Sequence, residues 1–358
     1  MDIRNLLKMM VERNGSDLFY RVGARPRIKI DGKVVSANEK TLTIHDLEQA
    51  SSILMTPEQK EKFDSTLDID FALYLQEFKR RFRVNIFMQR SEPSIVIRNI
   101  NTYIKSFEEL NLPAAIFNRL ALETRGLVLL TGSMGSGKST TIASMIEYIN
   151  TNCNKHILTV EEPIEFTFED KECIINQREL GLDVSSYAVA LRAFTLQSPD
   201  VMFISNIRDQ ETMMAAVTAA ETGVLVLSTI HSVNASQSVE RIINFFPPHQ
   251  HEEIRNQLSY LLKGVISLRL VPLKDGSGRV PAYEIMLHTP TIARLIREGK
   301  IWEIPHFIED GGVFGMISFN QCMIKLVKEG KIAEEEAMDF VDSKDEFGLA
   351  LKGIKKEG

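Results

Sequence analysis

The chain contains 358 residues, of which 44% are hydrophobic, and its 48 acidic and 42 basic side chains give a net charge of −6. This length exceeds what one hydrophobic core usually fills, so two domains are expected, and the acidic balance argues against a protein that wraps nucleic acid non-specifically. No apolar run approaches the length of a membrane-spanning helix, and the N-terminus lacks the layout of a secretion signal, which predicts a cytoplasmic protein.

In the first hundred residues, periodicity and turn signals predict a small α/β domain with a mixed sheet flanked by helices. The expected helices span residues 6–11, 45–55 and 57–64. The expected strands span residues 27–30, 33–35, 68–75, 81–89 and 94–99. Residues 31–32 are predicted as the turn of a hairpin, and residues 15–18 as a further turn.

Residues 101–112 are predicted to link two domains, because Pro113 is suited to begin a helix. Beyond it, strands alternate with helices, which is typical of a largely parallel sheet covered on both faces. The expected strands span residues 127–131, 156–161, 201–205, 225–230 and 265–271. The expected helices span residues 138–148, 186–196, 211–222 and 236–245. The remainder, from 289 to 358, is predicted to be helical, with breaks at Gly299, Gly311, Gly312 and Gly330.

The most specific motif lies between the first strand and the first helix of this second domain. The pattern G-x-x-x-x-G-K-[ST] is matched by Gly132, Ser133, Met134, Gly135, Ser136, Gly137, Lys138 and Ser139. Glycines let backbone N–H groups fold around a phosphate chain, Lys138 supplies a cation, and the Ser139 hydroxyl can ligate Mg²⁺. The motif therefore predicts a site for ATP and Mg²⁺, against the alternative of a glycine-rich turn without ligand.

Polar residues follow two other predicted strands at the carboxyl edge of the sheet, where open α/β proteins bind ligands. Glu161 and Glu162 close the strand that begins at residue 156, and carboxylates there could hold Mg²⁺. A solvated acidic turn is the alternative. His231 follows the strand 225–230, where an imidazole could respond to the γ-phosphate or simply cap a structural element.

Asn206 follows the strand 201–205, at a point where a nucleoside triphosphatase is expected to carry an acid. An amide can orient a water molecule but cannot accept its proton. Arg208 and Asp209 could pair with each other or with helix ends. In the first domain, Arg83 and Arg98 are the favoured candidates to reach a phosphate, because a guanidinium fork suits phosphate geometry.

The chain contains three cysteines and seven histidines, and neither set has metal-site spacing. The cysteines, which lie far apart and form no C-x-x-C pair, are Cys153, Cys173 and Cys322. We therefore expect reduced, mostly structural thiols, and no metal beyond a Mg²⁺ ion carried by the nucleotide.

Taken in order, these segments resemble the type IV pilus retraction ATPases of the PilT/PilU family, within the wider class of secretion ATPases. The resemblance covers nearly the whole chain. The matching segments are residues 15–18, 30–32, 81–85 with Phe87 and Gln89, 132–140, 159–166, 176–179, 219–223, 229–231 and 295–301. The linker at 100–102 and the final segment look closer to the PilU-like accessory branch.

The resemblance implies a PAS-like N-terminal domain at residues 1–100, a RecA-like ATPase core at 113–288 and a helical C-terminal region at 289–358. It implies that Lys138, Ser139 and Thr140 contact the nucleotide or its Mg²⁺. Glu161 and Glu162 become an acidic box near the metal, with Glu162 standing where the family usually has Asp. His231 becomes the second histidine of a pair, and arginines of the first domain are expected to reach the phosphates.

The resemblance also implies partners. The expected assembly is a homo-hexamer, or a mixed assembly with a paralogous retraction ATPase. An inner-membrane pilus platform protein is a further expected partner, which implies peripheral association with the cytoplasmic face of the inner membrane. No specific nucleic-acid partner is expected.

Three departures from the family pattern concern ATP hydrolysis. Ser205 and Asn206 stand where the family normally has Gly-Glu, so the expected catalytic glutamate is missing. Val224 replaces the first histidine of the pair, and Leu196 stands where relatives commonly have Arg. Because the binding loop is intact, the sequence predicts nucleotide binding and leaves turnover open.

Two functions of different classes follow. One is an ATP-driven motor subunit that couples hydrolysis to pilus disassembly and twitching motility, with Glu162 as the nearest acid that could compensate for Asn206. The other is a hydrolysis-deficient, ATP-binding accessory subunit that assembles with a competent retraction ATPase. A DNA-translocating ATPase is a weaker third reading, because the charge and the first domain count against it.

Overall fold

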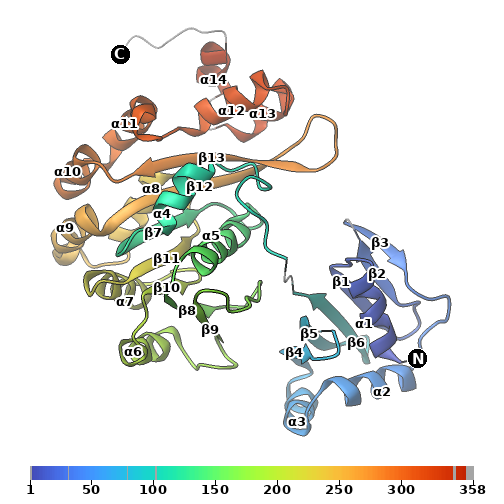
Figure 1. The fold of residues 1–358 in the computed structure, drawn as a ribbon. Helices are drawn as coiled ribbons and strands as arrows, with labels where there is room; N and C mark the ends of the chain where they lie inside the picture. The colour runs from blue at the N-terminus through green and yellow to red at the C-terminus, as the bar shows by residue number, and fades with distance from the viewer. Residues whose placement is uncertain (1, 31, 79, 101–102, 342–343, 352–358) are drawn as a thin grey trace. The chain divides into compact units, whose positions relative to one another are not determined.

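The computed structural model describes residues 2–30, 32–78, 80–100, 103–341 and 344–351. By its internal contacts the chain divides into two compact units, Met1–Tyr103 with Glu165–Thr167, and Ile104–Ile164 with Phe168–Gly358 (Figure 1). Part of the expected linker, residues 101–102, lies outside the described residues, as do Asp31 of the expected hairpin turn and residues 352–358.

The first unit is built on a six-stranded sheet with the order β3-β2-β1-β6-β5-β4. The strands are β1 (Asp17–Arg21), β2 (Arg27–Ile30), β3 (Lys33–Ser36), β4 (Asp68–Leu75), β5 (Arg80–Gln89) and β6 (Glu92–Asn99). Every neighbouring pair is antiparallel, so the expectation of a mixed sheet was wrong. Short turns join β1 to β2, β2 to β3, β4 to β5 and β5 to β6, and strands joined in this way pair antiparallel.

The prediction of a turn at residues 15–18 was also wrong in its second half. Asp17 and Leu18 lie in β1, opposite Arg98 and Ile97 of β6 on one side and opposite β2 on the other. Leu18 is fully buried. Pairing on both edges and burial of this leucine outweigh the local turn preference of the residues Gly15 and Ser16.

Three helices pack with this sheet: α1 (Ile3–Glu12), α2 (Ile44–Leu54) and α3 (Pro57–Thr66). Each begins where a side chain accepts a hydrogen bond from a backbone N–H of the first turn, at Asp2, Thr43 and Thr56 respectively. The buried faces of α1 and α2 join inward side chains of β1, β5 and β6 in one hydrophobic core. The first unit thus has a core of its own.

The second unit is built on a seven-stranded sheet with the order β13-β12-β7-β11-β10-β8-β9. The strands are β7 (Gly126–Thr131), β8 (His156–Glu161), β9 (Ile174–Glu179), β10 (Val201–Ile204), β11 (Leu225–Ile230), β12 (Leu262–Pro272) and β13 (Arg279–Leu287). All pairs are parallel except β12 with β13, which confirms the largely parallel sheet. β9 and β13 were not predicted, because β9 carries polar residues at a sheet edge and β13 contains a proline.

Helices of the second unit pack against this sheet (Figure 1). They are α4 (Ala114–Ala121), α5 (Lys138–Asn152), α6 (Tyr187–Gln197), α7 (Gln210–Glu221), α8 (Ala235–Ile243) and α9 (His251–Leu261). A 3₁₀ turn, η1 (Pro248–Gln250), precedes α9. The strands β7, β10 and β11 are buried along their whole length, as expected for the centre of a parallel sheet.

The C-terminal part is helical, as predicted, and Figure 1 shows α11 to α14 beyond β13, with α10 beside α9. They are α10 (Pro290–Glu298), η2 (Ile301–Glu303), α11 (Ile304–Asp310), η3 (Gly311–Phe314), α12 (Phe319–Lys328), α13 (Glu334–Phe340) and α14 (Lys344–Leu351). Gly299 ends α10 in a left-handed conformation. Across the described residues, no helix combines the length and apolar character needed to span a bilayer.

Candidate nucleotide site

Four parallel strands of the second unit end at one edge of the sheet. Ile230 of β11 lies opposite Thr131 of β7, and Ile204 of β10 lies opposite Ser228 of β11 and Val160 of β8. The residues that follow these strands therefore meet at this edge. They are the loop 132–139 after β7, His231 after β11, Ser205 and Asn206 after β10, and Glu162 after β8.

The loop between β7 and α5 depends on glycine for two physical reasons. Gly135 and Gly137 have φ of 76° and 97°, which L side chains rarely adopt. Gly132 has φ of 145°, and a Cβ there would lie 2.4 Å from Ser136 Oγ and 2.6 Å from the carbonyl oxygen of Leu268. The loop conformation therefore follows from the glycine positions in the motif.

Lys138 is folded back over this loop. Its ammonium group donates to the carbonyl oxygens of Gly132 at 2.8 Å and Ser133 at 2.7 Å, and the residue is only 8% exposed. Ser139 and Thr140 follow in the first turn of α5, both partly buried. The ammonium group is thus held at the mouth of the loop, at the N-terminus of a 15-residue helix.

The residues present fit a triphosphate carried with Mg²⁺. Gly137 is the N-cap of α5 and provides no side-chain cap, so backbone N–H groups of the first turn are left for an anion. The buried hydroxyl of Ser136 has no hydrogen-bond partner among the described residues. No group of three or more His, Cys, Asp or Glu in the described part of the chain could hold a metal by itself.

The two glutamates after β8 have different environments. Glu161 is 6% exposed and accepts hydrogen bonds from Thr159 Oγ1 at 2.7 Å and Gln177 Nε2 at 3.0 Å, so it is bound within the β8–β9 pair. The side chain of Glu162 is 41% exposed, and its carboxylate forms an ion pair with Arg208. Of these two glutamates, Glu162 is therefore the one whose carboxylate can reach a ligand at the strand edge.

Asn206 and Arg208 lie in the segment that follows β10. Asn206 has φ of 56°, and its N–H donates to Thr229 Oγ1 at 2.9 Å. When the side-chain amide of Asn206 is oriented with its oxygen toward Arg208, this oxygen accepts a hydrogen bond from Arg208 Nε at 2.8 Å. Arg208 and Asp209 do not pair with each other, because Asp209 caps α7 by accepting from the Thr212 N–H at 2.8 Å.

His231 lies beside the loop, close to the Gly132 backbone and to Lys138. Partial burial lowers the pKa of His231 below its ordinary value, and the positive charge of Lys138 adds to this effect. The lowered pKa favours the neutral imidazole. A neutral imidazole can both donate and accept a hydrogen bond at this edge.

One residue that the sequence did not single out, Tyr187, supports this edge of the sheet. The Tyr187 hydroxyl donates to the Ser205 carbonyl oxygen at 2.7 Å and lies 3.0 Å from Ser205 Oγ, which in turn accepts from the Glu162 N–H at 3.0 Å. Burial raises the pKa of Tyr187, which keeps it a donor. A tyrosine at the start of a helix carries no sequence signal for this role.

Arg83 and Arg98 lie in the first unit, whereas the loop lies in the second. They are direct cross-strand neighbours on β5 and β6. Arg83 Nε donates to both carboxylate oxygens of Asp70 at 3.0 and 2.9 Å, and Arg98 Nε donates to Asp17 Oδ1 at 3.0 Å. The structure thus places the two candidate arginines together, each oriented by an acid of its own unit.

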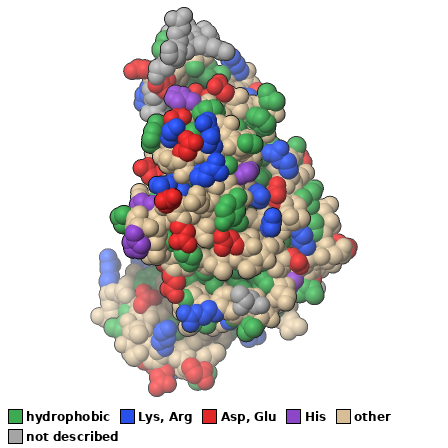
Figure 2. Space-filling model, turned by 90° about the vertical axis from the view of Figure 1, so that its left-hand side faces the viewer, with side chains coloured by type: hydrophobic (Ala, Val, Ile, Leu, Met, Phe, Trp, Pro, Cys, Tyr) green, Lys and Arg blue, Asp and Glu red, His purple; other side chains and the backbone are tan. Residues whose placement is uncertain are grey.

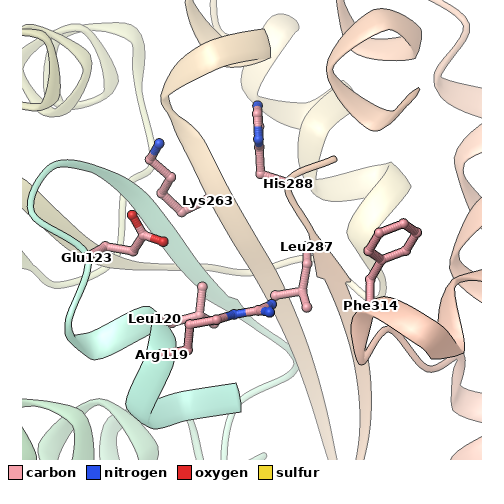
Figure 3. Close-up of a pocket in the computed structure, with 7 residues that line it drawn as sticks. All are labelled: Arg119, Leu120, Glu123, Lys263, Leu287, His288 and Phe314. Carbon is pink, nitrogen blue, oxygen red and sulfur yellow. The ribbon is translucent and has the colours of Figure 1, made fainter. Parts of the chain in front are cut away.

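A pocket of ≈ 270 Å³ lies elsewhere in the second unit (Figure 3). It is lined by Arg119, Leu120, Glu123, Lys263, Leu287, His288 and Phe314. Leu287 ends β13 opposite Gly264, near the start of β12, so this pocket belongs to the sheet edge remote from the loop. It contains none of the predicted site residues.

Figure 2 shows acidic and basic side chains interspersed over the face that it presents. Among the described residues of that face, neither sign covers a broad area.

Comparison with known proteins identifies the family. A family model described as "Type II/IV secretion system protein" matches residues 2–306. The "Type IV pilus ATPase PilU" of Pseudomonas aeruginosa is 40% identical over 352 residues, covering 98% of this chain and 92% of the relative. The "Type IV pilus retractation ATPase PilT" of the same species is 39% identical over 347 residues, covering 97% of this chain and all of the relative. The chain belongs to this secretion family, in its PilT/PilU group.

A solved structure of the group has the same fold. The crystal structure of the pilus retraction motor PilT with bound ADP matches with a TM-score of 0.90 at 38% identity, covering 97% of this chain and 98% of that one. The resemblance found in the sequence and the α/β fold class are both confirmed.

Proposed function

We propose that this chain is an ATP-binding motor subunit of type IV pilus retraction machinery, in which ATP binding and hydrolysis are coupled to pilus disassembly and twitching motility. The observation that carries the proposal is the loop at residues 132–139, with its buried Lys138 and an uncapped helix behind it. Relatives named as pilus ATPases share about 40% of their residues with this chain over nearly their full length.

The proposed roles follow from the positions of the side chains. Lys138 exchanges its loop carbonyls for phosphate oxygens, and the first-turn N–H groups of α5 bind the same chain of phosphates. Ser139 and Glu162 are the proposed contacts to Mg²⁺, which when bound neutralises phosphate charge. Glu161 holds the end of β8 from inside, and His231 responds to the outermost phosphate.

We further propose the architecture implied by the family. Residues 1–100 form a PAS-like domain, 101–112 a linker, 113–288 a RecA-like core and 289–358 a helical C-terminal region. The subunits assemble into a homo-hexamer or mix with a paralogous retraction ATPase, with Arg83 and Arg98 reaching phosphate. The ring acts at the cytoplasmic face of the inner membrane, bound there through a pilus platform protein.

A second candidate function is favoured by one observation at the end of β10. Asn206 presents an amide that accepts from Arg208, and an amide cannot take a proton from an attacking water molecule. Under this reading the chain binds ATP and shapes a mixed ring, while a paralogue hydrolyses it.

Phosphate release separates the two functions. We expect slow release by the purified protein, and faster release by Asn206→Glu, because a general base contributes a factor of about 10² to 10⁴ to the rate. Brisk release by the unmodified protein would remove the accessory reading. Release that is negligible in the unmodified protein and restored in Asn206→Glu would support it.

Nucleotide binding tests the loop itself. We expect Lys138→Ala to abolish calorimetric binding of ATP with Mg²⁺, because it removes the only buried ammonium group of the loop. Met134→Ala is the matched control. The Met134 side chain is exposed in the same loop, so this variant should bind ATP as the unmodified protein does. Unchanged binding by Lys138→Ala would contradict the proposed function.

A further inference from the structure

Glu162 and Arg208 form an ion pair between the ends of β8 and β10. The two side chains are 41% and 54% exposed, so the pair is solvent-screened. Among the described residues, Arg208 is the one cation that pairs with Glu162. The guanidinium group also donates through Nε to the Asn206 side-chain oxygen, which keeps Arg208 anchored on its own strand end.

The backbone on both sides of this ion pair is fixed. Ser205 Oγ accepts from the Glu162 N–H at 3.0 Å, and the Tyr187 hydroxyl holds the Ser205 carbonyl oxygen at 2.7 Å. The Asn206 N–H donates to Thr229 Oγ1 of β11 at 2.9 Å. Because these bonds fix the main chain, the ion pair can open by side-chain rotation while the strand ends stay in place.

Because the side chain of Asn206 is neutral, it contacts Arg208 without competing with Glu162 for the positive charge. Arg208 carries one full positive charge, and its second partner is a neutral amide rather than a carboxylate. Glu162 is therefore the acid that neutralises Arg208 at this edge. A metal ion that approaches Glu162 encounters a carboxylate already compensated by a guanidinium group.

We propose that Arg208 is the counter-ion that Glu162 exchanges for nucleotide-borne Mg²⁺, so that Arg208 sets the Mg²⁺ concentration at which the site accepts a metal–nucleotide complex. This inference rests on the proposed function, because it requires a nucleotide at the loop. Arg208 is a positioning residue here. It acts through Glu162 and competes with the metal for the same carboxylate.

The exposure of the ion pair sets the size of the expected shift in the Mg²⁺ midpoint. Exposed ion pairs contribute about 0.2–1 kcal/mol, which is weak enough to be exchanged and strong enough to measure. Removing the guanidinium group should therefore lower the free Mg²⁺ concentration at half-maximal binding by up to about fivefold. Arg208→Lys keeps a cation and should stay near the wild-type midpoint.

The experiment is a titration of fluorescently labelled ADP binding against free Mg²⁺ for the wild type, Arg208→Gln, Glu162→Gln and the double variant. We expect the midpoint to fall in Arg208→Gln and to be identical in Glu162→Gln with and without the Arg208 change. A merely structural role would weaken binding at every Mg²⁺ concentration and would not depend on Glu162. Arg119→Gln, on the remote pocket, is the control and should leave the midpoint unchanged.

Two results would overturn the inference alone: nucleotide binding with an unshifted or raised midpoint in Arg208→Gln, or the same shift in the Glu162→Gln background. Failure of the wild type to bind nucleotide at any Mg²⁺ concentration would overturn the proposed function and this inference with it. Thermal unfolding of each variant shows whether it is folded, and Arg208→Met, which also removes the positive charge, takes the place of Arg208→Gln if that variant is not folded.

Discussion

At the scale of single residues, the candidate site depends on a few positions where one side chain is required. Gly132 leaves no room for a Cβ against Ser136 and the Leu268 carbonyl group. Lys138 is held over the loop by two carbonyl oxygens that a phosphate would replace. Both requirements are local, which explains why the motif could be recognised from the sequence.

Gly132→Ala should damage the loop. The Cβ would collide with Ser136 Oγ and adopt a backbone conformation that L residues avoid, at a cost of about 1–3 kcal/mol. We expect lower stability in urea and at least tenfold weaker ATP binding by calorimetry. Gly278→Ala is the control, because a Cβ there meets nothing within 4 Å and the backbone is not left-handed. Equal behaviour of the two variants would refute this account of Gly132.

At the scale of the element, the helices that follow the parallel strands begin in different ways. Side-chain caps from Ser186, Asp209 and Asn234 satisfy N–H groups at the starts of α6, α7 and α8. α5 begins at Gly137 without such a cap. Of these four helices, α5 is the one whose first turn is arranged to receive an external anion.

Asp209→Ala should destabilise α7 without affecting the loop. The lost hydrogen bond to the Thr212 N–H is worth about 1 kcal/mol. Asp209→Asn should retain most of the stability, because asparagine caps about as well as aspartate. Denaturant unfolding measures both, and ATP affinity should change little in either. If Asp209→Asn lost as much stability as Asp209→Ala, the negative charge of Asp209, rather than its capping hydrogen bond, would be what stabilises α7.

At the scale of the whole molecule, the chain holds two separate hydrophobic cores. One joins α1 and α2 to the antiparallel sheet of the first unit, and the other surrounds the parallel sheet of the second. The nucleotide loop belongs to the second unit. Stabilisation by a ligand should therefore act mainly on the second unit.

Calorimetric unfolding should show that ATP stabilises the second unit more than the first. The larger unit should unfold with the larger enthalpy, at about 0.7 kcal/mol per residue. ATP with Mg²⁺ at about 100 times its Kd should stabilise that transition by about 2.7 kcal/mol. Lys138→Ala should lose this stabilisation by ATP, while Met134→Ala should keep it. An increase confined to the smaller transition would contradict the assignment of the loop to its unit.

Much of the fold was accessible from the sequence, and the exceptions have physical causes. β7, β10 and β11 are continuous apolar runs, so they were predicted nearly at their observed bounds. β9 carries polar side chains at a sheet edge and was missed. β1 was taken in part for a turn, because its pairing with β6 joins residues about eighty positions apart, which no local pattern reveals.

The sequence by itself determined the phosphate loop and the alternation of strands and helices that places strand ends at one edge. Both are encoded within short windows, by glycine conformation and by hydrophobic periodicity. Only the tertiary structure decided that Glu161 is buried while Glu162 pairs with Arg208, and that Tyr187 supports Ser205. These contacts join residues on different elements, and their geometry depends on strand order and side-chain burial, which a linear pattern does not contain.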